Sequence, residues 1–277
     1  HHRSSAASDV YKRQAMHYRF NFDEEQHDFI LYHFTSQMNG DEEHAKKVIA
    51  HVSTYVAPQW GVRPSTHAII ETLYEGFVEK FNAHLTQYPY LLGGKPCLGD
   101  FGLMCPLYGH LGRDPVPHRL LQMQGPWIHR WVERMNRPEP DTGEYINLPH
   151  SFLQDDEVPE TIIELLTHFA LDFVPETIAS HSGINRWLKE NKPAIGTQCE
   201  RYAGEAEFDV EGTAIHVCPQ PFRFYLLERV QSAIQALKGS DQADALALLD
   251  TCNMTAVLDL KLDRKIGRAN NLEVWLD

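Results

Sequence analysis

The sequence lacks the features that mark membrane and secreted proteins. It has no apolar run near the roughly 18 residues that a membrane span needs, and it shows no signal peptide. Its five cysteines are scattered and odd in number, and they form no C-x-x-C pair: Cys97, Cys105, Cys199, Cys218 and Cys252. This usage fits a reducing compartment better than a disulfide framework. We therefore expect a cytoplasmic protein without a membrane partner.

Positive charge is also scarce. The 277 residues include 25 Lys and Arg against 38 Asp and Glu, which leaves a formal net charge of −13. Such a surface repels phosphate backbones, so we expect no nucleic-acid partner. The longest basic cluster has four members, and we interpret it as a solvated face: Lys261, Arg264, Lys265 and Arg268. The length and the 43% of hydrophobic residues allow one or two domains with a sizeable core.

The common metal, phosphate and hydrolase motifs are missing as well. None of the 16 histidines forms H-x-x-x-H or H-E-x-x-H, so we predict no metal site. His110 and His118 flank a proline loop, and we expect them to bond backbone groups. Cys97 precedes a helix, whose dipole lowers a thiol pKa, so it is a candidate nucleophile. No basic partner is placed beside it, which favours a packed helix-cap thiol instead.

The first residues read as foreign to the rest of the chain. Residues 1–14, HHRSSAASDVYKRQ, show no apolar period, and residues 7–14 resemble a translated sequencing adaptor. We expect residues 1–14 to be a non-native leader, irregular and unpacked, because nothing there offsets the entropy of ordering. A flexible natural N-terminus is the alternative.

The remaining periodicity predicts a mainly α protein. Residues 15–137 read as a bundle of five or six helices, and the segment 98–111 is so apolar that it should be the central, buried helix. The Pro-, Asp- and Gly-rich residues 136–143 are the predicted domain boundary. Residues 138–277 read as an α-rich extension with one β-hairpin near 205–217, where Glu211-Gly212 supplies a two-residue turn. Helices are expected at residues 158–173, 175–189, 222–237 and 242–252, and the tail 255–276 is ambiguous.

One loop carries a family resemblance. Leu91 to Phe101 reads LLGGKPCLGDF, in which Asp100 stands three residues after Cys97 at the start of an apolar helix. This is the spacing of a capping box, although a thiol is a weaker acceptor than the usual hydroxyl. The loop resembles the hallmark of the glutathione S-transferase family, which feeds the buried helix of its C-terminal helical domain. The resemblance covers residues 17–137, and residues 138–277 resemble an extension found in some bacterial members.

The resemblance implies a function and a site. In the family, a thioredoxin-like domain binds glutathione and activates its thiolate, and this chain shows no such β-α-β pattern. We therefore expect a fragment that is inactive alone, with no catalytic residue of its own. The intact protein would use glutathione as co-substrate to attack a small hydrophobic electrophile, by conjugation or lysis.

Three residues are candidates for the wall of the electrophile pocket: Tyr32, Met38 and Tyr108. Their residue types equally suit core or interface positions, which is the interpretation that we favour from the sequence alone. A homodimer is left open. The alternative function is a non-enzymatic interaction or assembly module of the same helical fold.

Overall fold

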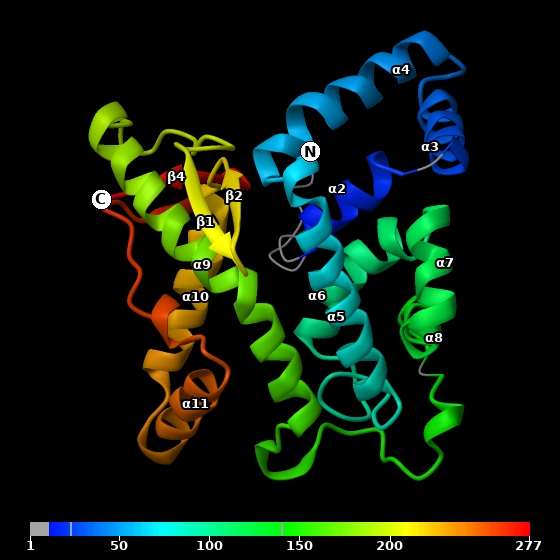
Figure 1. The fold of residues 1–277 in the computed structure, drawn as a ribbon. Coiled ribbons are helices and arrows are strands. Elements are labelled where there is room, and N and C mark those ends of the chain that lie inside the picture. Colours follow the sequence, from blue (N-terminus) through cyan, green and yellow to red (C-terminus); the bar gives the residue numbers. More distant parts are fainter. Residues whose placement is uncertain (1–10, 23, 140) are drawn as a thin grey trace. The chain divides into compact units, whose positions relative to one another are not determined.

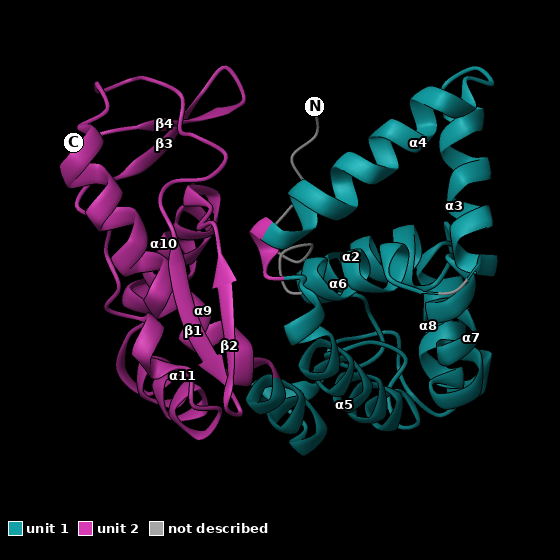
Figure 2. Ribbon diagram, turned by 45° about the horizontal axis from the view of Figure 1, so that its top comes forward, with its two compact units in different colours: residues 1–58, 62–168 teal, residues 59–61, 169–277 magenta. Residues whose placement is uncertain are grey.

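The computed structural model describes residues 11–22, 24–139 and 141–277, and these residues are mainly helical with two small antiparallel sheets (Figure 1). They divide into two compact units (Figure 2). Unit 1 comprises residues 1–58 and 62–168, and unit 2 comprises residues 59–61 and 169–277. The predicted mainly α class is therefore confirmed at this coarse level.

The regular elements in the described part of unit 1 are helices, joined by loops. Its elements are α2 (Lys12–Phe20), α3 (Glu24–Gln37), α4 (Glu42–His51), the π-helical turn η1 (Val52–Val56), α5 (His67–Leu85), α6 (Leu98–Pro106), the π-helical turn η4 (Leu107–Leu111), α7 (Pro115–Gln124) and α8 (Pro126–Met135). The long helix α9 (Glu160–Asn191) begins in unit 1, and the division between the units falls inside it.

The core of unit 1 is built around α5. Its apolar side chains at Ile70, Phe77, Phe81 and Leu85 are completely buried, and the helix packs against α2, α7 and α8. The expectation that residues 98–111 form the central helix is wrong. Within α6, Leu98 is 88% exposed and keeps one apolar face of the helix at the surface. An apolar composition alone cannot distinguish a buried helix from one with an unpartnered apolar face.

The expectation that residues 1–14 are irregular and unpacked is wrong for residues 11–14. Tyr11 is 2% exposed, and its ring centroid lies 4.3 Å from that of Phe77. Tyr11, Ala15 and Tyr18 are buried and recur at helical spacing, so they form an apolar stripe that crosses the expected end of the leader. Burial of this stripe against α5 offsets the entropy of ordering it. Residues 1–10 lie outside the described residues.

The expected boundary at residue 137 lies within unit 1. Tyr145 is buried, and its hydroxyl donates to the carbonyl of Leu85 at the end of α5. Further along, the backbone N–H of Leu153 donates to the carbonyl of Leu92 at 3.1 Å. These bonds tie residues 141–153 to the helical bundle. The proline-, aspartate- and glycine-rich stretch therefore marks a loop, not the end of a domain.

Unit 2 combines helices with two hairpins. Its other elements are β1 (Ala206–Val210), β2 (Thr213–Val217), α10 (Pro221–Ala236), α11 (Gly239–Thr251), β3 (Ile266–Ala269) and β4 (Leu272–Trp275). The predicted hairpin is confirmed: β1 and β2 pair with Phe208 opposite Ile215, and Glu211 and Gly212 turn with φ of 50° and 84°. Trp275 is completely buried in the core of this unit, where it stacks on Trp187.

Two features of unit 2 differ from expectation. Residues 158–173 and 175–189 were expected to form two helices, but α9 runs through Pro175 without interruption. Proline removes one N–H from a helix but does not have to end it when both flanks are packed. Residues 59–61 also belong to this unit, because Gln59 accepts a backbone bond from Cys218 at 2.7 Å and Trp60 donates to the Tyr202 hydroxyl at 2.9 Å.

Candidate functional site

A capping box fixes the start of α6. The Asp100 carboxylate accepts the backbone N–H of Cys97 at 2.9 Å, and the Cys97 side chain accepts from the backbone of Asp100. The same carboxylate accepts the N–H of Leu91 at 3.2 Å and the indole N–H of Trp131 at 3.1 Å. Asp100 is completely buried, so α6 is anchored to both its own loop and α8.

Cys97 does not have the environment of an activated nucleophile. It is half-buried, and burial followed by the negative charge of Asp100 raises the pKa of its thiol. A raised pKa keeps the sulfur protonated at neutral pH, whereas a nucleophilic cysteine needs a lowered one. The structure therefore favours the packed cap thiol.

The anchored helix leads to a pocket in unit 1. The pocket has a volume of about 450 Å³ and lies among η4, α7 and α8. Its floor is apolar, because Leu121 is completely buried and Val132 is 8% exposed. Its other lining residues are polar or aromatic: Tyr108, Gly112, Arg113, His118, His129, Glu133 and Asn136.

A tight turn joins the two helices of the pocket. Pro115 stands in the first turn of α7, and Gly125 with Pro126 ends α7 and begins α8. Proline suits a first helical turn because its missing N–H would have no partner there. The turn brings His118 on α7 and His129 on α8 together across the pocket wall.

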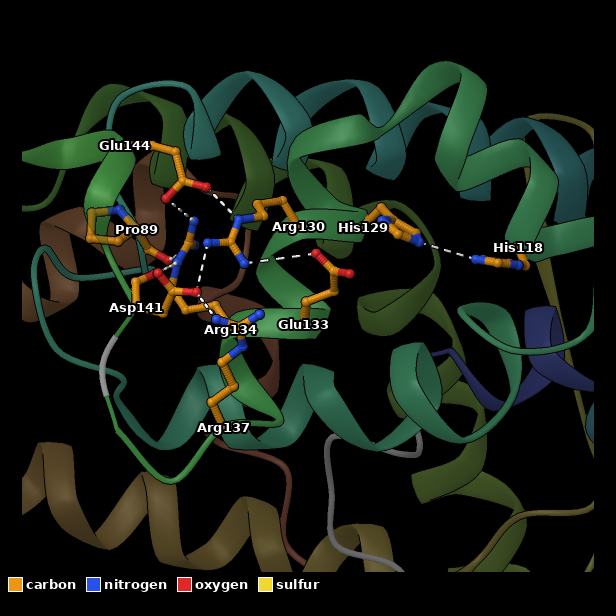
Figure 3. Close-up of polar contacts among 9 residues, drawn as sticks. All are labelled: Pro89, His118, His129, Arg130, Glu133, Arg134, Arg137, Asp141 and Glu144. Carbon is orange, nitrogen blue, oxygen red and sulfur yellow. Dashed lines mark hydrogen bonds and ion pairs between the residues drawn. The ribbon is translucent and has the colours of Figure 1, made fainter.

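The two imidazoles meet directly. Nε2 of His118 lies 3.1 Å from Nε2 of His129, and the rings stack with centroids 5.2 Å apart (Figure 3). One nitrogen must donate and the other accept, so the bond requires at least one neutral ring. Burial, and then the proximity of His129, lowers the pKa of His118. The lowered pKa favours the neutral form of the His118 ring at neutral pH.

A buried ionic cluster lies next in sequence to the pocket residue Arg113. Arg19 on α2 forms an ion pair with Asp114 at 3.5 Å and bonds His110. Asp114 is 1% exposed, and burial raises its pKa to about 6 although Arg19 and Arg113 oppose the shift. Burial and the same two arginines lower the pKa of His110 to about 4. The cluster links α2 to the segment before α7.

The arginines of α8 form a separate network. Arg130 donates to Asp141 at 2.8 Å and bonds Glu144, and Arg137 also bonds Asp141 (Figure 3). Arg134 is 1% exposed and donates to the carbonyls of Asp141 and Pro89, at 2.8 and 2.9 Å. Each arginine has a partner inside the protein, so this network fastens residues 141–144 to α8.

The predicted pocket residues are not gathered in one place. Tyr108 lines the pocket and is 50% exposed. Tyr32 on α3 is 70% exposed, and neither it nor Met38 belongs to the pocket lining.

The expectation that His110 and His118 bond backbone groups missed their side-chain partners, Arg19 and His129. Sequence reasoning also missed His129 as a site residue. The available signal was the Gly125-Pro126 turn, which folds the helix carrying His129 back onto the helix carrying His118.

Neither a metal centre nor a membrane span is found in the part of the chain that the structure describes. No group of three or more His, Cys, Asp or Glu side chains there is arranged to hold a metal ion. Among the same residues, no helix has both the length and the apolar character to cross a bilayer. Comparison with protein-family models, curated proteins and solved structures found no match to this chain.

Proposed function

We propose that unit 1 is the helical half of a glutathione-dependent transferase or lyase, and that the pocket bearing Tyr108 binds the electrophile. One observation carries the proposal: the capping loop anchors α6 through Asp100, and the same helical run ends in η4, where Tyr108 lines a pocket with an apolar floor. The loop spacing is the one that resembles the glutathione S-transferase family.

The pocket suits an aromatic electrophile. Leu121 and Val132 provide an apolar floor, and the Tyr108 ring offers a stacking face. The lining residues Arg113 and Asn136 carry N–H donors for a nitro or carbonyl group. In the family that the loop resembles, thiolate activation belongs to the thioredoxin-like domain. We therefore assign binding to this unit and thiolate chemistry to such a domain acting with it.

The test uses 1,3-dinitrobenzene, an unreactive analogue of aromatic electrophiles that quenches tryptophan fluorescence. We expect saturable quenching of the intact chain and a two- to tenfold weaker affinity after Tyr108→Ala, since an aromatic pair contributes about 0.5–1.5 kcal/mol. Tyr32→Ala is the matched control, because it removes an exposed tyrosine that is outside the pocket. Equal effects of the two substitutions, or none from Tyr108→Ala, would refute the assignment.

A second candidate is an assembly module in which α6 packs against a second copy of the chain. Leu98, Phe101 and Cys105 are exposed at positions i, i+3 and i+7, so they share one apolar face. Apolar faces of this kind mark interaction sites. Sedimentation velocity at increasing concentration should then show a dimer that Phe101→Glu converts to a monomer. A wild-type protein that stays monomeric at all concentrations would contradict this second candidate.

A further inference from the structure

A second pocket lies in unit 2, and it shares no residue with the proposed function. It has a volume of about 270 Å³ and is formed by one side of α10 and the irregular segment before β3. Its apolar residues are Phe224, Leu260, Leu262 and Ile266; its uncharged polar residues are Gln231, Ser232 and Gln235; its charged residues are Glu228, Lys261, Arg264 and Lys265.

The pocket concentrates positive charge in an acidic protein. Three cationic residues and one anionic residue line it, whereas the whole chain has a net charge of −13. Arg264 donates to the carbonyl of Pro193 at 2.6 Å. Within the described part of the chain, the ammonium groups of Lys261 and Lys265 have no hydrogen-bond or ion-pair partner. These two charges are therefore available to a ligand.

The segment that carries the lysines is held in place by its backbone. The Gln231 side chain, 5% exposed, donates to the carbonyls of Val257 and Leu260 at 2.9 and 3.0 Å. The carbonyl of Lys261 accepts from His181 at 2.7 Å, and that of Lys265 accepts from the N–H of Leu276 at 2.8 Å. A segment fixed in this way loses little entropy when a ligand binds to it.

An apolar floor completes the pocket. Phe224 is 5% exposed and Ile266 is 6% exposed, and both belong to the core of unit 2. A fully hydrophilic anion would gain nothing from this floor, and a neutral apolar molecule would leave the lysines unpaired. The volume lies below the usual range for drug-sized ligands, which favours a small molecule.

We propose that this pocket binds a small organic anion with an apolar body, whose anionic group pairs with Lys261 and Lys265 while its body lies on Phe224 and Ile266. This assigns the basic cluster seen in the sequence a binding role in place of a solvated face. Arg268 is not part of the site, because it is engaged with Glu273 and the carbonyl of Asn271.

The test uses octanoate as the probe and isothermal titration calorimetry of the full chain. We expect saturable binding that is weakened at least tenfold by the double substitution Lys261→Gln/Lys265→Gln, and that weakens as salt is added. The matched control is Lys192→Gln/Lys238→Gln, which removes the same charge from two exposed lysines outside the pocket. Circular dichroism checks that both variants are folded.

Two further probes separate the charge from the apolar body. Acetate carries the same anionic group without the body, and 1-octanol carries the body without the charge. We expect both to bind at least tenfold more weakly than octanoate. Octanol binding as tightly as octanoate, equal affinities for the two double variants, or no saturation by octanoate up to about 10 mM would overturn the proposal.

Discussion

Removal of the Asp100 carboxylate is the most direct test of how α6 is held. The side chain is completely buried and accepts three hydrogen bonds, from the N–H groups of Leu91, Cys97 and Trp131. Asp100→Ala leaves three donors unpaired, and an unsatisfied buried group costs about 1–3 kcal/mol. Burial raises the pKa of Asp100, because a charged carboxylate is unfavourable away from water. The alanine variant no longer has to bury this charge, which partly offsets the cost of the unpaired donors. We expect a net destabilisation of about 3 kcal/mol, more than the roughly 1 kcal/mol typical of a lost cap.

The assay is urea unfolding followed by 19F NMR of 5-fluorotryptophan, in which the Trp131 resonance reports on the indole bonded to Asp100. Asp100→Asn keeps one acceptor oxygen and the volume, so it should cost about half as much. Cys97→Ser should be neutral or stabilising, because a hydroxyl is the better acceptor. An Asp100→Ala variant with the wild-type midpoint and an unshifted Trp131 resonance would refute the reasoning.

Three further predictions concern packing, pH and ligand binding. Gly94→Ala should destabilise by about 1–3 kcal/mol, because its Cβ would lie 2.0 Å from the carbonyl oxygen of Pro149; Gly143→Ala, which meets nothing within 4 Å, should change the urea midpoint little. The pKa of His118 is lower in the folded state, so the unfolded state takes up the proton first and stability is lost as pH falls below about 6.5. His118→Gln should therefore reduce the slope of unfolding free energy against pH between about 6.5 and 5. Calorimetry should detect no saturable glutathione binding below about 1 mM, because the described residues form only two-stranded antiparallel sheets and no thioredoxin-like sheet. Saturable binding below that concentration would contradict our assignment of roles.

The two hairpins show what local sequence can predict. Glu211-Gly212 lies between strands of alternating character and was recognised as a turn. Asn270 and Asn271 adopt φ of 51° and 61°, the same left-handed geometry, yet the second hairpin was not predicted. Its strands span four residues each, too few for alternation to stand out. Asn-Asn was the available signal, since asparagine tolerates left-handed backbone better than most residues.

Local sequence likewise predicted some residues of the candidate site and missed others. Cys97 and Asp100 are three residues apart, so a spacing rule found them. The contact between His118 and His129 depends on how two helices fold back on each other, and that of Arg134 with Pro89 joins residues 45 apart in the chain. Tertiary packing decides such pairs, and a single sequence carries little information about it.

The exposed apolar face of α6 bears on both candidate functions. A helix apolar on nearly every side was expected to be central, yet Leu98 and Phe101 are 88% and 59% exposed. Exposed apolar side chains at helical spacing cost free energy that burial against a partner would recover, at about 25 cal/mol per Å². Asp100 holds this face rigidly in place, because its carboxylate bonds both the loop and α8. A rigid apolar face suits a second domain in a transferase as well as a second copy in an assembly. The two substitutions separate these cases: Tyr108→Ala acts on the pocket of one unit, whereas Phe101→Glu acts on association and should leave the binding of dinitrobenzene unchanged.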